Sequence, residues 1–269
     1  CCGTMDRHPH SAAEPLNGVD CTIPLVPLAL VWPERRLLAV ADMHFEKGAA
    51  YGSMGTFLPP YDSRANLQAL QSVLERHQPE TVVCLGDSFH DVSAGERMAT
   101  SDRAALATLI GGRDWIWITG NHDPYLPSGL TGAVVPSFEL GPLHFRHEAV
   151  ASIGYGEISG HFHPKARIRL RGRTLSCRCF ATDGRRLILP AFGAYAGGLN
   201  VLDPALGAVL GKKLVVYALR NGAVHTVGRR SLVVEPEPAP ATLLWAERDG
   251  GVLGGGDFGG VPPAPRRRA

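Results

Sequence analysis

Polar motifs that follow predicted β-strands constrain the fold of this chain more than any other feature of its sequence. Five such motifs occur in one order. They are Asp42-Met43-His44, Gly86-Asp87, Gly120-Asn121-His122-Asp123, His147 and Gly160-His161-Phe162-His163. Groups at the carboxyl ends of strands in an open α/β sheet converge on one crevice. We therefore expect these motifs to form a single site.

Hydrophobic periodicity predicts βαβ units in the first half of the chain and mostly strands in the second. Buried strands are predicted at 35–41, 81–85 and 115–119, and helices at 62–77 and 101–110. Asp62 or Ser63 is the expected cap of the first helix, and Ser101 of the second. Further strands are predicted at 133–140, 142–147, 155–160, 165–171, 174–181, 185–189, 198–202 and 213–219. The prediction is an α/β fold, a sandwich of two sheets flanked by helices, with an antiparallel second sheet.

Composition predicts one central domain between two tails. We expect a loose tail at 1–20, a folded domain at 21–234 and a Pro/Gly-rich, largely disordered tail at 235–269. The six cysteines form no disulfide or zinc spacing, and the first twenty residues lack the apolar core of a secretory leader. The apolar stretch at 23–32 is broken by prolines and is too short to span a bilayer. We expect a cytoplasmic protein, free or associated with the nucleoid, with no membrane partner.

The residue types in the motifs indicate bound metal ions. Carboxylates and imidazoles gathered in one crevice repel one another or lose their hydration unless cations are present. Each motif alone is common, since Gly-Asp also marks ordinary turns and an isolated histidine is more often a satisfied core or surface residue. The ordered set supplies enough oxygen and nitrogen ligands for two ions. Because two adjacent divalent cations bind phosphate oxygens and lower the pKa of water, the set predicts phosphoester hydrolysis.

The ordered set resembles the calcineurin-like metallophosphoesterase superfamily over roughly residues 35–200. The resemblance implies a site for two divalent metal ions, to which each motif contributes. It assigns Asp42, His44 and His163 to the first ion, Asn121, His147 and His161 to the second, and Asp87 as a bridge between them.

The same resemblance implies roles for residues that bind no metal. His122 is expected near the substrate phosphate, where it stabilises charge or protonates the leaving oxygen. His147 is preferred to His144 as a ligand because only His147 lies at the predicted strand end. Asp91 and Asp123 are expected to orient imidazoles from behind.

Longer segments resemble the bacterial DNA-ligase-associated metallophosphoesterases (PdeM). These segments are 42–48, 57–62, 86–91, 160–164 and 190–200. The resemblance implies a Mn²⁺-dependent phosphodiesterase with DNA endonuclease activity, acting in DNA repair beside a ligase, a helicase and an exonuclease-like protein. Nitrogen and oxygen ligands also suit Fe or Zn. The segment that ends in His90-Asp91 is also similar to double-strand-break repair nucleases, in which that histidine lies beside the active site; otherwise His90 only caps a turn.

A run of basic residues follows the last motif. Cations occupy alternate positions of a predicted strand, which places them on one face. They are Lys165, Arg167, Arg169, Arg171 and Arg173. Such a face beside a phosphodiester-cleaving centre suits a DNA backbone, although charge on an edge strand also serves to resist aggregation.

Two other functions compete with a DNA phosphodiesterase. The chain could hydrolyse small-molecule or protein phosphoesters, against which the basic run and His90 argue. It could also be an inactive scaffold on the same fold. His122 and all seven ligand positions are filled, which argues against a scaffold.

Overall fold

The structure, a computed structural model, describes residues 12–15, 22–53, 55–56, 58–59, 61–150, 155–211 and 213–235. All of them belong to one unit, Cys1–Glu235. The expectation of a disordered C-terminal tail lies outside the described residues, apart from Glu235 itself.

The helices and strands are short and numerous. In chain order they are β1 (Ala12–Pro15), β2 (Thr22–Val26), β3 (Ala29–Trp32), η1 (Pro33–Arg35), β4 (Leu37–Val40), α1 (Lys47–Ser53), α2 (Asp62–His77), β5 (Thr81–Leu85), α3 (Ala94–Arg97), α4 (Thr100–Ile110), β6 (Asp114–Ile118), β7 (Ala133–Val135), β8 (Ser137–Leu140), β9 (Leu143–Arg146), β10 (Glu157–Ser159), β11 (Lys165–Leu170), β12 (Arg173–Thr182), β13 (Arg186–Ile188), α5 (Pro204–Val209), β14 (Val215–Arg220), β15 (Ala223–Val227) and η2 (Arg229–Ser231). No helix in the described ranges combines the length and the apolar character needed to cross a membrane.

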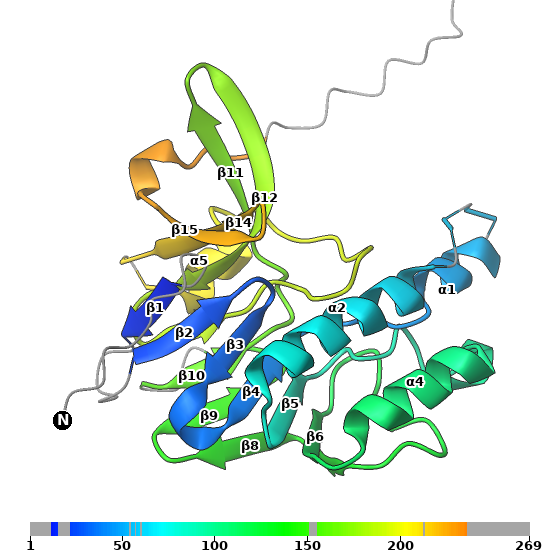
Figure 1. Cartoon of the computed structure of the whole chain (residues 1–269). Coiled ribbons are helices and arrows are strands. Elements are labelled where there is room, and N and C mark those ends of the chain that lie inside the picture. Colours follow the sequence, from blue (N-terminus) through cyan, green and yellow to red (C-terminus); the bar gives the residue numbers. More distant parts are fainter. Residues whose placement is uncertain are drawn as a thin grey trace, which may run out of the picture. The chain divides into compact units, whose positions relative to one another are not determined.

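Within the described part of the chain the strands form two sheets, with α2 and α4 on the outer face of the first (Figure 1). The first sheet has the order β1-β2-β3-β4-β5-β6-β7, and β4 to β7 are parallel. The second has the order β15-β14-β12-β13-β10-β9-β8, with β11 paired to β12. The predicted α/β sandwich of two sheets flanked by helices is confirmed.

The second sheet is mixed, so the prediction that it is antiparallel was wrong. β10 is parallel to both β9 and β13. The chain leaves β10, runs out along β11 and returns along β12 before it enters β13, so β13 resumes the direction of β10. The parallel pair β9 and β10 has its carboxyl ends at one edge, which is what a shared site requires.

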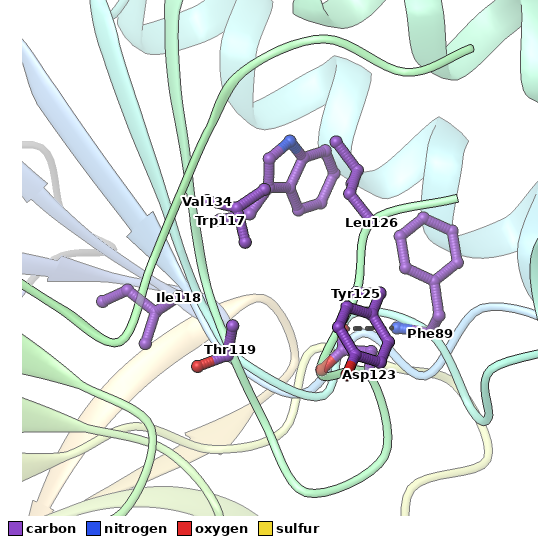
Figure 2. A pocket seen from close by; sticks show the side chains of 8 residues that line it. All are labelled: Phe89, Trp117, Ile118, Thr119, Asp123, Tyr125, Leu126 and Val134. Atoms are coloured by element: carbon purple, nitrogen blue, oxygen red, sulfur yellow. Dashed lines mark hydrogen bonds between the residues drawn. The ribbon is translucent and has the colours of Figure 1, made fainter. Parts of the chain in front are cut away.

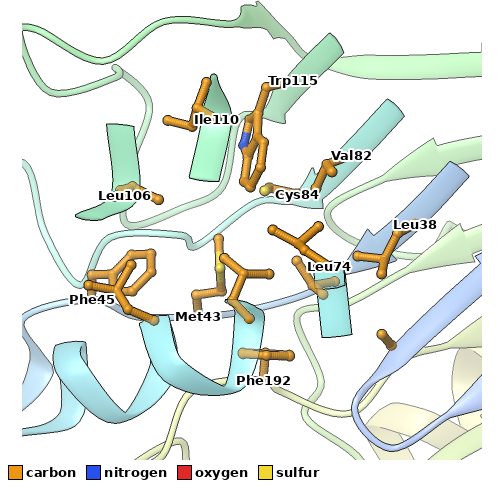
Figure 3. Close-up of a cluster of buried hydrophobic side chains, with 14 of the residues drawn as sticks. Leu38, Met43, Phe45, Leu74, Val82, Cys84, Leu106, Ile110, Trp115 and Phe192 are labelled. Carbon is orange, nitrogen blue, oxygen red and sulfur yellow. The ribbon is translucent and has the colours of Figure 1, made fainter. Parts of the chain in front are cut away.

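The central strands of the first sheet are buried on both faces, as their continuous apolar runs predict. In β5, Val82 and Cys84 face the helices, and Val83 and Leu85 face the second sheet. Figure 3 shows the cluster under the helices, where residues from α2 and α4 pack on β4, β5 and β6. A third cluster joins the other face of the second sheet to α5. Each fully buried aliphatic side chain contributes about 1.5–3 kcal/mol.

The predicted helix at 62–77 and strand at 81–85 match α2 and β5, but the predicted caps were wrong. Neither α2 nor α4 has a side-chain N-cap. Asp62 Oδ2 instead accepts a hydrogen bond from Gly48 N at 3.0 Å, and Ser63 Oγ donates to Glu46 Oε1 at 2.7 Å. The start of α2 therefore fastens the segment that follows the first motif.

One predicted strand is absent, and several observed strands were not predicted. The range 198–202 is not a strand, and Asn200 forms only an isolated bridge with Lys165 before α5 begins. Ala12–Pro15 forms β1, inside the range expected to be a loose tail. The strands β2, β3 and β15 were not predicted either. These strands are short and lack the alternation that reveals a half-buried strand.

Candidate metal centre

Loops from both sheets carry the predicted ligands to one place. Asp42 and Asp87 lie two residues beyond β4 and β5, and Asn121 lies three residues beyond β6. From the second sheet, His147 follows β9 directly and His161 lies two residues beyond β10. The site is thus built at the carboxyl ends of strands, where parallel strands commonly gather functional groups.

The ligand atoms form two groups, each with its atoms within 4.8 Å of one another. The groups are Asp42, His44 and His163, and Asp87, His147 and His161. In the first group, His163 Nε2 lies 3.3 Å from both His44 Nε2 and Asp42 Oδ1. In the second, His147 Nε2 lies 3.4 Å from Asp87 Oδ2 and 3.1 Å from His161 Nδ1. This division is the one that the resemblance implied, while the bridging role of Asp87 stays a prediction.

Asn121 lies beside the second group. Its amide nitrogen is 3.3 Å from His161 Nδ1, and turning the amide by half a rotation places its oxygen there instead. His144, the alternative ligand to His147, lies away from both groups, where it pairs with Glu139 at 3.0 Å.

The second group fits a cation. His147 Nδ1 donates to the carbonyl oxygen of Leu85 at 2.8 Å, which leaves Nε2 as the nitrogen that faces the ligand group. Nε2 points at the buried carboxylate of Asp87. Nitrogen and oxygen atoms gathered at this distance can share one cation. The donors are oxygen and nitrogen, a set that suits Mn²⁺, Fe or Zn.

Burial keeps His44 ready to act as a ligand. Its pKa is lowered to about 2, first by burial and then by the nearby charges of His163 and Lys47. The ring is therefore neutral at any physiological pH, and a neutral imidazole is the form that binds metal.

Five of the proposed ligands have a strained backbone. Positive φ angles between 45° and 68° occur at Asp42, His44, Asp87, His161 and His163. Residues other than glycine rarely adopt this conformation, which costs on the order of 1–3 kcal/mol each. Such strain persists only where surrounding contacts impose it, and here it makes five ligands converge.

The loop of the first motif is held by alternate side chains. Asp42 and His44 face the centre, while Met43 and Phe45 are buried in the cluster beneath the helices (Figure 3). Asn66 of α2 donates to the carbonyl oxygen of Met43 at 2.8 Å. The apolar residues between the ligands thus anchor the loop in the core.

The segment 190–200 braces both loops of the first group. Phe192 N donates to the carbonyl of Ala41 at 2.8 Å, and Gly193 N donates to the carbonyl of Asp42 at 3.1 Å. A Cβ at Gly193 would lie 2.4 Å from the Met43 carbonyl oxygen, and one at Gly198 would lie 2.1 Å from the His163 carbonyl oxygen. Both glycines are therefore required by close backbone approach.

Asp123 holds the turn that carries Asp87. Its carboxylate accepts backbone hydrogen bonds from Asp87 N, Ser88 N, Phe89 N and Gly120 N, at 2.6–3.1 Å. Burial raises its pKa to about 6, so the carboxylate is ionised at neutral pH and can accept all four. The expectation that Asp123 orients an imidazole was wrong, because its hydrogen bonds go to the backbone. Figure 2 shows it beside a pocket of about 10 Å³, too small for a substrate.

His122 and His90 stack beside the first group, with ring centroids 5.5 Å apart. His122 Nδ1 donates to the His90 carbonyl oxygen at 2.8 Å, and its Nε2 lies 4.0 Å from Asp87 Oδ2. The His122 side chain is 47 % exposed, so Nε2 is open to a substrate. Asp91 pairs with Arg97 and accepts from Ser93 N, rather than orienting an imidazole as expected.

Residues 35–186 match the family model of calcineurin-like phosphoesterases, which is more than half of the chain. The chain belongs to this family. The crystal structure of Pseudomonas putida nuclease MPE is similar, with 29% sequence identity and a TM-score of 0.62, over 81% of this chain and 100% of that one. YfcE, a phosphoesterase from E. coli, aligns over 71% of this chain and 97% of its own, at 13% identity and a TM-score of 0.38. Comparison with curated proteins finds no match.

One contact at the centre of this calcineurin-like phosphoesterase could not be read from its sequence. Glu148 Oε1 lies 3.8 Å from His161 Nε2, on the side of the ring opposite the ligand group. At this distance the carboxylate makes no hydrogen bond to the ring, but it adds negative charge behind a proposed metal ligand. Glu148 follows His147 directly, but adjacency on a loop carries no signal of this role.

The basic run of this phosphoesterase does not lie on one face, so that prediction was wrong. Lys165, Arg167 and Arg169 share a face of β11, Arg171 lies in the turn with φ 49°, and Arg173 opens β12 opposite Leu170, on the other face. The turn at 171–172 shifts the alternation, because it inserts residues that belong to neither strand. Figure 1 shows the hairpin of β11 and β12 projecting from the sheets.

The base of the hairpin lies next to the metal centre. Arg178 lies opposite Lys165 in the register of the two strands. Its guanidinium donates to the carbonyls of Phe192 and Ala194, in the segment that braces the first group. Arg178 therefore serves the fold. Arg167 pairs with Glu235 at 3.0 Å, and among the described residues Lys165 and Arg169 form no ion pair.

Proposed function

We propose that this protein is a dinuclear metal-dependent phosphodiesterase that cleaves DNA internally and uses Mn²⁺. One observation carries the proposal: two adjacent groups of buried and partly buried oxygen and nitrogen ligands lie at one edge of the sandwich, with the partly exposed ring of His122 beside them. Membership of the calcineurin-like phosphoesterases supports phosphoester hydrolysis.

Each residue has a defined task in the proposed reaction. Asp42, His44 and His163 would hold one cation, and Asp87, His147, His161 and Asn121 the other. A bound pair of divalent cations supplies positive charge that lowers the pKa of water and neutralises a phosphate ester. Glu148, 3.8 Å from His161 Nε2, adds negative charge behind that ring.

His122 is the proposed proton donor to the leaving oxygen. The His90 carbonyl fixes the ring through Nδ1, so a second proton can reside only on Nε2, which faces the open side of the centre. A positioned general acid of this kind contributes about 10²–10⁴-fold to the rate.

DNA is the proposed substrate because basic side chains line one face of the projecting hairpin, beginning beside the metal centre. Lys165, Arg167 and Arg169 share one face of β11, and the base of that face meets the segment 190–200 through Arg178. The similar structure from Pseudomonas putida is a nuclease. Following the sequence resemblance, we further propose that the enzyme is a cytoplasmic DNA-ligase-associated metallophosphoesterase that acts in DNA repair with a ligase, a helicase and an exonuclease-like protein.

The decisive experiment is a metal-titrated assay on four substrates. It compares supercoiled plasmid, single-stranded DNA, a chromogenic phosphodiester and the matching monoester, with wild type and with His122→Ala. The proposal predicts cleavage of the DNA and the diester that depends on Mn²⁺ and falls about 10²-fold or more in the variant, with metal content retained. Hydrolysis confined to the monoester would favour a small-molecule or protein phosphoesterase and refute the DNA assignment.

The hairpin provides a separate test of DNA binding. Replacing both Arg167 and Arg169 with Ala should weaken DNA binding and lower the slope of log affinity against log salt by about two. Arg173→Ala, on the opposite face of the same hairpin, is the matched control and should bind like wild type. Equal losses in both proteins would refute the assignment of DNA contact to this face of β11.

A further inference from the structure

Lys47 is a half-buried lysine beside the metal centre that the roles described so far leave unused. It opens α1 three residues after His44, and its backbone N donates to the His44 carbonyl at 3.3 Å. Gly48, the next residue, is fixed by Asp62, which leaves no room for a Cβ at that position. The start of α1, and with it Lys47, is therefore held in place.

Ring contacts connect Lys47 to the centre. Its ammonium group lies 6.0 Å from the ring centre of Tyr51, and the Tyr51 ring lies 5.8 Å from the His90 ring. The His90 ring in turn lies 5.9 Å from the ring of His44 in the first ligand group and 5.5 Å from the ring of His122.

No carboxylate compensates this cation at close range. Among the described residues, no Asp or Glu oxygen lies within 4.0 Å of the Lys47 ammonium. The carboxylate of Asp62 already accepts from Gly48 N. The Lys47 ammonium makes no hydrogen bond or ion pair with the described residues, so its N–H donors can take an oxygen atom of a ligand.

With both metal ions bound, the position of the Lys47 ammonium is electrostatically unfavourable unless an anion is bound as well. Two divalent cations outweigh the two carboxylates in the ligand groups, so the loaded centre repels a neighbouring ammonium. An anion bound to the metal ions replaces this repulsion with attraction. When one non-bridging oxygen of a phosphodiester binds the metal ions, the other remains available to Lys47. Lysine binds such an oxygen as a compact point charge.

We propose that Lys47 is a substrate-binding residue whose ammonium group takes a non-bridging oxygen of the phosphate held at the metal centre, while the Tyr51 ring keeps its stem in place. The inference rests on the proposed function, since it assumes an anionic phosphoester as substrate. It assigns to a residue of α1 a role that neither the ligand groups nor His122 fills.

The test uses two variants of Lys47 and one control in the Mn²⁺-loaded protein. Lys47→Met keeps the length of the side chain and removes its charge, and Lys47→Arg keeps the charge. Lys213→Met alters an exposed lysine on the loop before β14 and is the matched control. Metal content and thermal unfolding are measured first for all three.

Two readouts follow. The first is kcat and KM for the chromogenic diester, and the second is the affinity for inorganic phosphate by calorimetry. Loss of one charge-assisted hydrogen bond predicts a fall of about 10- to 100-fold in kcat/KM and in phosphate affinity for Lys47→Met. Lys47→Arg should recover most of both, and Lys213→Met should match wild type.

The outcomes separate this inference from the proposed function. If wild type cleaves the diester and Lys47→Met does so equally well with equal phosphate affinity, the role of Lys47 is refuted while the phosphodiesterase stands. If wild type leaves the diester intact, the proposed function fails, and phosphate affinity alone decides the role of Lys47. Loss of Mn²⁺ from a folded Lys47→Met protein would also overturn the inference, because Lys47 would then support the metal centre instead.

Discussion

Replacement of Asp123 by Asn tests whether a buried carboxylate builds the metal centre from behind. Oδ1 accepts from Asp87 N and Gly120 N, and Oδ2 accepts from Ser88 N and Phe89 N. Asn has the same shape but only one oxygen, so its amide nitrogen must face two buried N–H donors. Each N–H left without an acceptor costs ~1–3 kcal/mol, which gives a loss of ~2–6 kcal/mol in the free energy of unfolding. For a domain of this size the unfolding temperature should fall by about 4–24 °C.

The measurement is urea and thermal unfolding of the metal-free variant, followed by Mn²⁺ binding by calorimetry. Because the lost bonds hold the turn that carries Asp87, metal affinity should fall together with stability. Asp203→Asn is the matched control, since Asp203 is an exposed N-cap of α5 and Asn caps helices equally well. If the metal-free Asp123→Asn protein unfolds within about 0.5 kcal/mol of wild type, the four hydrogen bonds do not act as described.

Three further predictions concern the metal ions and the loops that hold them. Asp87→Ala should remove both ions if the carboxylate bridges them, and two full equivalents of Mn²⁺ by elemental analysis would rule the bridge out. Gly193→Ala should cost ~1–3 kcal/mol and weaken Mn²⁺ binding, because its Cβ meets the Met43 carbonyl oxygen at 2.4 Å; calorimetry that finds wild-type affinity would contradict this. Chelation should lower the unfolding temperature, and Mn²⁺ at a hundred times its Kd should restore ~2.7 kcal/mol per site. If neither chelation nor added Mn²⁺ changes the unfolding temperature, no ion binds the folded protein.

The sequence was informative where one local pattern decides the structure. Continuous apolar runs predicted β4, β5 and β6, because strands covered on both faces need apolar side chains at every position. The stripe of leucines in α2 predicted that helix from end to end. Since the first three motifs follow these strands, the position of Asp42, Asp87 and Asn121 was predicted by the same reasoning.

The remaining features depend on contacts between distant segments. Asp62 and Ser63 were expected to cap α2, yet tertiary hydrogen bonds to Gly48 and Glu46 compete successfully for their side chains. The predicted strands at 165–171 and 174–181 placed the turn one residue beyond its position at Arg171 and Gly172, and the alternation of the basic run was extended across it to Arg173. Glu148 lies in a loop and Lys47 opens the short helix α1, and no periodicity fixes how either segment approaches the centre.

The strain at the ligands explains why so much of the surrounding sequence is devoted to bracing. Five left-handed ligands cost roughly 5–15 kcal/mol together, comparable with the whole net stability of a domain. Met43 in the core, Asp123 behind Asp87 and the segment 190–200 against the first loop offset that cost before any cation arrives. The cations then bind a centre that is already assembled, so loss of a brace should weaken metal binding even where every ligand remains.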